Sequence, residues 1–209
     1  MRTTLACAVV GVVLLMPWSA LGQAGRRGDV LDVNTASEKQ LASVPGMTTG
    51  LVKTLLDRRP FLLMTDLDAA LQALMPAQRA EVYRRLFVQV NVNAAPDEEL
   101  RLVPGMTAAT AAAVRGGRPY KTLVQFRNEV GAAIGEPGVA ALDPFVFVPI
   151  NLNTASDADI MTIPRMGQRM LREFKEYRPY KALTQFRREI GKYVDAREVA
   201  RLERYVTLD

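Results

Sequence analysis

Three stretches of this chain share one sequence pattern and lie about sixty residues apart. They read Asn34-Thr-Ala-Ser37 with Val44-Pro-Gly-Met47, Asn93-Ala-Ala-Pro96 with Val103-Pro-Gly-Met106, and Asn153-Thr-Ala-Ser156 with Ile163-Pro-Arg-Met166. Each is followed by Arg-Pro and an aromatic residue, at Arg59-Pro60-Phe61, Arg118-Pro119-Tyr120 and Arg178-Pro179-Tyr180. The prolines at 45, 104 and 164 are separated by 59 and then 60 residues. A constant period of this length predicts one small module used three times.

The period divides the chain into three units, which we place at 30–89, 90–149 and 150–209. A unit of this size lies near the lower limit at which a domain builds a sufficient core by itself. We therefore expect neighbouring units to pack on one another.

The first 24 residues are typical of a secretory signal peptide. Arg2 gives a basic start, an apolar run extends from Leu5 to Trp18, and small residues lead to Ala24. We expect cleavage after Ala24 or Gly22 and export to the periplasm or the extracellular space. The alternative is an uncleaved membrane anchor, although the run is shorter than the ~20 residues that a span needs. Cys7, the only cysteine, falls in this stretch, so the exported chain is expected to hold together by packing without disulfides.

The composition argues against catalysis. The chain contains no histidine and one cysteine, and therefore lacks the commonest general base and metal ligand. Carboxylates such as Glu98-Glu99 and Asp157 with Asp159 fall where helices are expected to begin. Negative charge at a helix N-terminus is stabilised by the helix dipole, so these acids have a structural explanation. We predict no enzyme activity, no catalytic residues, no cofactor and no bound metal.

The net charge of +5 is unevenly distributed. Residues 150–209 carry twelve Lys and Arg against nine Asp and Glu, and Arg26 with Arg27 adds to the surplus near the start of the expected exported chain. A modest basic surplus permits an anionic partner but does not demand one.

The local patterns predict an all-α fold with about four short helices in each unit. Ser37 with Gln40 and Ser156 with Asp159 form capping-box patterns, and Pro96 suits the first helical position in the second unit. A second helix is expected over 48–58, 107–115 and 167–177, with apolar pairs at Leu51/Leu55, Ala109/Ala113 and Met170/Phe174.

The second half of each unit is expected to hold two more helices and to end in a short apolar extended stretch. Leu67, Phe126 and Phe186 align in the third helix of the three units. We expect these residues to be equivalent core positions, because each is the large apolar residue of an otherwise shared pattern.

The sequence pattern of the three units resembles that of the helix-hairpin-helix family, and specifically the tandem modules of ComEA-type competence proteins. Those modules open Asn-x-Asn-Thr-Ala and continue with Leu-Pro-Gly-Ile-Gly and Tyr-Arg. The matching residues here are Val33-Asn-Thr-Ala36, Val92-Asn-Ala-Ala95, Leu152-Asn-Thr-Ala155 and Tyr177-Arg178. The resemblance covers essentially the whole chain after the leader. It implies three helix-hairpin-helix units that bind DNA without sequence preference, in the setting of DNA uptake.

The resemblance also implies which residues would contact DNA. A glycine turn lets the backbone approach a phosphate, and the amides that open the next helix are donors favoured by the helix dipole. Such contacts are independent of base sequence and sensitive to salt. The turn positions are Gly46, Met47, Thr48, Gly105, Met106, Thr107, Arg165, Met166 and Gly167, and the added basic residues are Lys53, Arg169 and Arg172.

The chain also departs from the family pattern. Thr48 and Thr107 replace the second glycine, and Arg165 replaces the first. A β-branched threonine resists positive φ, and its hydroxyl is expected to cap the second helix instead. For Arg169 and Arg172, the acids Glu173 and Glu176 are alternative partners to phosphate. A structural or protein-interaction module that kept the fold and lost the phosphate sites therefore remains the alternative to DNA binding.

Overall fold

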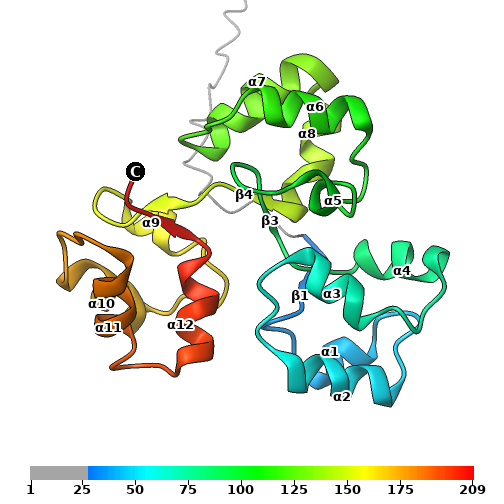
Figure 1. The fold of residues 1–209 in the computed structure, drawn as a ribbon, viewed down its shortest axis with the longest axis horizontal. Coiled ribbons are helices and arrows are strands. Elements are labelled where there is room, and N and C mark those ends of the chain that lie inside the picture. The colour runs from blue at the N-terminus through cyan, green and yellow to red at the C-terminus, as the bar shows by residue number, and fades with distance from the viewer. Residues whose placement is uncertain (1–27) are drawn as a thin grey trace, which may run out of the picture.

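The computed structural model describes residues 28–209, so the predicted leader over 1–24 lies outside the described residues. The described chain is mostly helical, and a strand, four helices and a second strand follow one another three times. We call these stretches the first (31–87), second (90–147) and third (150–207) segments. Figure 1 shows them as three groups of helices around the region that contains the strands. The predicted all-α class therefore holds in its main feature, with short strands added.

The elements of the three segments occur in the same order. The first segment consists of β1 (Leu31–Asp32), α1 (Glu38–Ala42), α2 (Thr49–Arg58), α3 (Met64–Ala70), α4 (Pro76–Tyr83) and β2 (Leu86–Phe87). The second consists of β3 (Val90–Asn91), α5 (Asp97–Leu100), α6 (Ala108–Gly116), α7 (Leu123–Ile134), α8 (Glu136–Leu142), the 3₁₀ turn η1 (Asp143–Phe145) and β4 (Val146–Phe147). The third consists of β5 (Ile150–Asn151), α9 (Asp157–Ile160), α10 (Gln168–Glu176), α11 (Leu183–Ile190), α12 (Ala196–Glu203) and β6 (Val206–Thr207).

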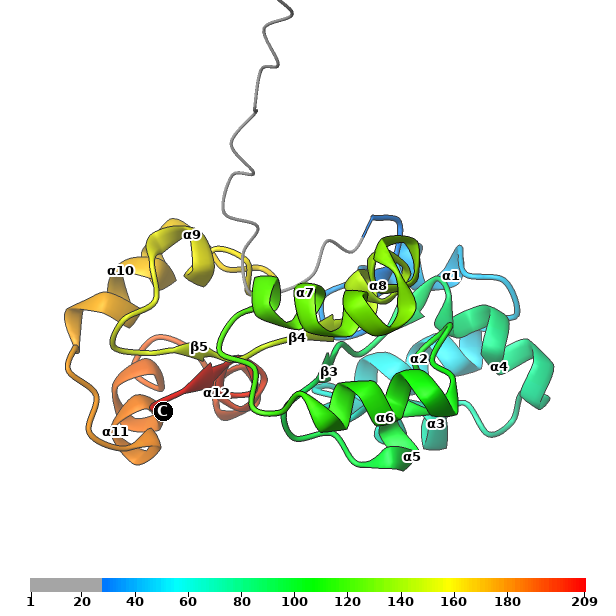
Figure 2. The same ribbon diagram turned by 90° about the horizontal axis from the view of Figure 1, so that it is seen from above.

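Each segment is closed by pairing of its own two ends. β1 pairs with β2, β3 with β4 and β5 with β6, always in parallel. Parallel strands need a long crossover connection, and here the four helices supply it. Figure 2 shows β3, β4 and β5 in the middle of the molecule, with helices to either side. The sequence predicted extended stretches at both ends of each unit but not that they pair.

The helix starts follow the local sequence closely. Ser37 with Gln40 and Ser156 with Asp159 both form complete capping boxes, as predicted. The prediction for Pro96 was wrong by one residue, because Pro96 is the N-cap with ψ 167° and α5 begins at Asp97. The fixed φ of proline suits both the N-cap and the first helical position, and the extended ψ of Pro96 places it outside the helix.

The core positions confirm one alignment and correct another. Leu67, Phe126 and Phe186 are all 0% exposed, as expected for equivalent residues. The pair Ala109/Ala113 was wrong, because Ala109 is exposed and the buried positions of α6 are Thr110, Ala111 and Val114. The spacing of 59 and 60 from Leu55 leads to Val114 and then Phe174, which are 0% exposed.

The repeated asparagine has a structural role in every segment. The Asn34 amide donates to the Phe61 carbonyl at 2.9 Å and accepts from the Phe61 amide at 2.7 Å. Asn93 makes the same two bonds with Tyr120, and Asn153 with Tyr180. A buried backbone N–H and C=O without a partner would be costly, so each asparagine satisfies the turn that follows the second helix.

The repeated arginine of the Arg-Pro-aromatic turns binds the opening of its own segment. The Arg178 guanidinium donates to the carbonyls of Leu152 and Ala155 at 2.6 and 2.8 Å, and Arg118 donates to Val92 and Ala95. Arg59 donates to Ala36 at 2.6 Å. The Arg-Pro peptide bonds are cis in all three segments. These repeated arginines therefore have partners within the fold.

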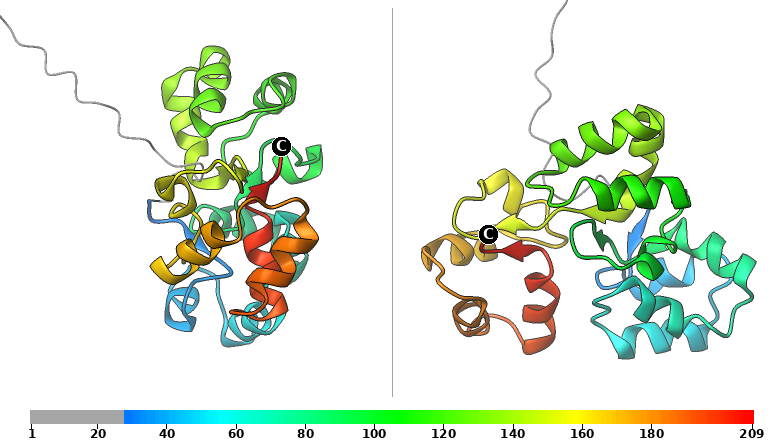
Figure 3. Two further views of the ribbon diagram at one scale, coloured as in Figure 1. Left: turned by 90° about the vertical axis from the view of Figure 1, so that its left-hand side faces the viewer. Right: turned by 45° about the horizontal axis from the view of Figure 1, so that its top comes forward.

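The segments pack on one another, as the small size of each unit led us to expect. One core cluster runs through the first and second segments, and a second cluster combines Phe147 with the third segment. Phe87 meets Phe145 edge to face at 5.0 Å between ring centroids, and Phe147 meets Tyr205 at 4.6 Å. Figure 3 shows the arrangement of the three groups of helices from two further directions. Aromatic pairs thus join consecutive segments at equivalent places.

Candidate nucleic-acid interface

The turns between the first two helices of each segment share one backbone geometry. We call residues 44–48, 103–107 and 163–167 the first, second and third hairpin turns. Gly46, Gly105 and Arg165 have φ of 85°, 83° and 59°, and the next amide bonds back to the carbonyl three residues earlier in each turn. Arg165 is the one non-glycine residue with positive φ in the described part of the chain. The left-handed residue is therefore the first of the two family glycine positions.

Thr48 and Thr107 do not have the positive φ that was expected at the second glycine position of the family pattern, so that expectation was wrong. Thr48 and Thr107 have φ of −95° and −96°, and Gly167 at the same place has −103°, so no glycine is needed there on backbone grounds. The predicted capping is confirmed, since the Thr48 hydroxyl accepts from the Leu51 amide at 3.2 Å and the Thr107 hydroxyl from the Thr110 amide at 3.1 Å. Gly167 has no side chain, so α10 begins without a side-chain cap.

The three hairpin turns expose the same positions and turn the same side chain inward. Gly46, Gly105, Arg165 and the residues that cap the following helices are exposed. The methionines point inward instead: Met166 is 7% exposed, and the partly buried Met47 and Met106 pack against the core. The backbone and the capping residues, and not the methionine side chains, are thus the surface that a ligand would meet.

The three predicted basic residues have different surroundings. Lys53 forms an ion pair with Asp57 one turn along α2, at 2.6 Å, and both side chains are exposed. Arg169 lies over the Tyr193 ring at 5.4 Å from the centroid. In the described range, neither Arg169 nor Arg172 forms an ion pair with Glu173 or Glu176. Two exposed guanidinium groups on α10 are therefore not neutralised by the acids that the sequence offered as partners.

The charge of Arg165 acts on a residue of another segment. Burial lowers the pKa of Arg59 in the first segment, Asp32 opposes this effect, and the charge of Arg165 lowers the pKa further. The Arg169 guanidinium, by contrast, lies over a tyrosine ring of its own segment. The structure does not gather the predicted arginines against one neighbour.

Two basic residues beside the second hairpin turn were missed from the sequence. Arg84, the residue after α4, and Arg101, the residue after α5, line the same groove as Pro104, Gly105 and Met106. In the linear sequence α6 is rich in alanine, and the first basic residue after the turn is Arg115. Arg84 precedes the turn by about twenty residues and belongs to the first segment, so no local pattern links it to Gly105.

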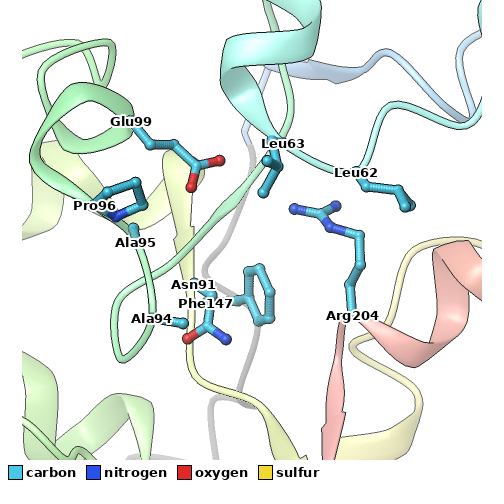
Figure 4. Close-up of a pocket in the computed structure, with 9 residues that line it drawn as sticks. All are labelled: Leu62, Leu63, Asn91, Ala94, Ala95, Pro96, Glu99, Phe147 and Arg204. Atoms are coloured by element: carbon cyan, nitrogen blue, oxygen red, sulfur yellow. The ribbon is translucent and has the colours of Figure 1, made fainter.

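A separate cavity of about 230 Å³ lies where the three segments meet (Figure 4). Leu62 and Leu63 come from the first segment, Glu99 and Phe147 from the second, and Arg204 from the third. The Glu99 carboxylate accepts from the Met64 amide at 2.7 Å, and burial raises the pKa of Glu99 while the Met64 bond and the Arg204 charge lower it. The Arg204 guanidinium donates to the Gln89 carbonyl at 2.7 Å and lies over the Phe147 ring.

The polar groups of this cavity therefore connect the segments to one another. Glu99 caps α3 across the boundary between the first and second segments, and Arg204 ties the third segment to the connection between them. Buried polar groups that are paired in this way fix one arrangement of the neighbouring parts.

Over residues 28–209 no cluster of three or more His, Cys, Asp or Glu side chains is placed to hold a metal ion. No helix in the same range is long and apolar enough to cross a membrane. The chain matches no family model, no curated protein and no solved structure.

Proposed function

We propose that this protein is an exported, non-catalytic protein of three tandem helix-hairpin-helix units that binds DNA without sequence preference, in the setting of DNA uptake. The hairpin turns would contact the sugar-phosphate backbone through their main chain. Arg169, Arg172 and, more weakly, Lys53 would add positive charge. Binding of this kind reads phosphates and not bases.

The main support is the geometry of the three hairpin turns. Each has an exposed left-handed residue at its third position, three residues before the next helix begins. The first-turn amides of a helix have no partner within the helix, and they favour an anion. The third turn supports the proposal best, because Gly167 leaves the start of α10 without a side-chain cap and Arg169 and Arg172 are exposed on that helix.

A structural or protein-interaction role is the second candidate, and the first two turns favour it. The Thr48 and Thr107 hydroxyls already occupy one helix-opening amide each, and Lys53 is paired with Asp57. A turn that satisfies its own donors has less to offer a phosphate. The two candidates differ in one measurable property, which is salt-dependent affinity for DNA.

The test is fluorescence anisotropy of a labelled random-sequence duplex with the purified protein at several salt concentrations. Three or four phosphate contacts predict a log–log salt slope on the order of −2 to −4. Arg169→Glu with Arg172→Glu should abolish most of the binding on every sequence tried, and Lys53→Glu should reduce it less. Lys181→Glu with Arg197→Glu is the matched control, since both residues are exposed in the third segment and the change in net charge is the same.

Two results would remove the proposal. The first is no binding by the wild-type protein at low salt, which would leave the interaction-module candidate. The second is equal loss of binding in the α10 variant and in its control, because bulk charge alone would then explain the effect. Circular dichroism of all variants checks that helicity is unchanged.

A further inference from the structure

The second hairpin turn forms one wall of a groove of about 600 Å³ whose other wall belongs to the first segment. From the first segment come Ala80 and Tyr83 of α4 and Arg84, the residue after α4. From the second come residues 101–106, with Ala141 and Phe145. The groove therefore exists only because the two segments pack together.

The side chains that line the groove carry only positive charge. Among its lining residues Arg84 and Arg101 are charged, and none is acidic. The Arg84 Nε atom lies 3.8 Å from the Glu81 carboxylate, and the Arg101 Nη2 atom lies 3.9 Å from the Asp97 carboxylate. Both separations exceed a hydrogen bond, and the two arginine side chains are 67% and 75% exposed. Asp97 is hydrogen-bonded to Arg115, so Arg115 and not Arg101 is its nearest cationic partner.

The floor of the groove holds its walls in place. Tyr83 and Phe145 are each 6% exposed, and both pack against Phe87 edge to face. The Tyr83 hydroxyl also donates to the Asp68 carboxylate. The rest of the lining is mostly apolar, so the guanidinium groups of Arg84 and Arg101 supply the only charged side chains of the groove.

The outer side of the turn is open. A side chain added at Gly105 would meet no atom within 4 Å, so nothing in the described chain covers this face. The residues equivalent to Arg84 in the strand register are Pro144 and Arg204, and Arg204 is bound to Gln89 at the junction. The exposed arginine pair is thus particular to the second hairpin turn.

We propose that this groove is a phosphate-binding site for nucleic acid that the first and second segments build together, with Arg84 and Arg101 as its basic contacts. It rests on the proposed function and adds to it a contact that spans two segments. A polyanion backbone fits because the charged side chains of the groove are two exposed arginines beside the open main chain of the second hairpin turn.

The test compares two double variants of equal charge change. Arg84→Glu with Arg101→Glu alters the groove, and Arg85→Glu with Arg197→Glu is the control, since Arg85 and Arg197 are exposed and line no part of the groove. We expect the groove variant to bind random duplex DNA about tenfold or more weakly than the control at low salt. Loss of two phosphate contacts should also make the salt slope shallower by about 1.8.

The outcomes separate this inference from the proposed function. If wild-type protein binds DNA and the groove variant binds as well as the control, the groove is not a contact and the proposed function stands. If wild-type protein does not bind at low salt, both fail. Competition by poly-glutamate as effective as competition by DNA at equal charge concentration would make the site an acidic-peptide site and would overturn the nucleic-acid assignment. Thermal melts that match between the two variants exclude unfolding as the cause.

Discussion

Replacement of Asn34 by alanine should destabilise the protein strongly without touching any candidate DNA contact. Asn34 is 7% exposed and satisfies both the N–H and the C=O of Phe61, which is itself 2% exposed. Each buried backbone group left without a partner costs about 1–3 kcal/mol. Two such groups predict a loss of about 2–6 kcal/mol, which is a large fraction of the ~5–15 kcal/mol that stabilises a typical domain. Asn93→Ala and Asn153→Ala should cost less, because these side chains are partly exposed and water can replace them.

The assay is urea unfolding followed by the helical circular dichroism signal. Tryptophan fluorescence is unsuitable, since the only tryptophan is Trp18 in the predicted leader. Asn128→Ala in α7 is the matched control, because Asn128 is exposed, and it should change stability by no more than about 0.5 kcal/mol. A loss below about 1 kcal/mol for Asn34→Ala, or an equal loss in the control, would refute the structural role of the repeated asparagine.

Three further predictions concern the core, the segment junction and the leader. Phe186→Ala should cost about 3–5 kcal/mol in the same assay, because Phe186 is 0% exposed, and a loss below about 1 kcal/mol would contradict its core position. Burial raises the pKa of Glu99 above its ordinary 4.5, so the folded state binds more protons and stability falls as pH rises through that interval. Glu99→Gln keeps an acceptor for Met64 and should gain stability relative to wild type from acidic to neutral pH, whereas a constant difference would refute this role. Mass spectrometry of exported protein should show a chain that starts near Gln23 or Gly25, and an intact Met1 would favour an anchor.

The candidate site could be predicted only in part from the sequence. The turns around Gly46, Gly105 and Arg165 were found because a Pro-Gly or Pro-Arg pair at a constant period is a local signal. The capping by Thr48 was also predictable, since an N-cap hydroxyl acts on an amide three residues away. Arg84 was not predictable, because its place beside the second turn depends on how two segments pack.

The sequence by itself determined the period, the helix starts and the equivalence of Leu67, Phe126 and Phe186. These features depend on residues three to four apart or on a regular repeat, and such relations are visible in one dimension. Tertiary structure alone decided the rest. It paired strand ends across each segment, joined asparagines to turns 27 residues away, and placed Glu99 on an amide 35 residues earlier. Contacts of this range form only when helices pack and bury their unpaired backbone groups, and that packing has no local signature.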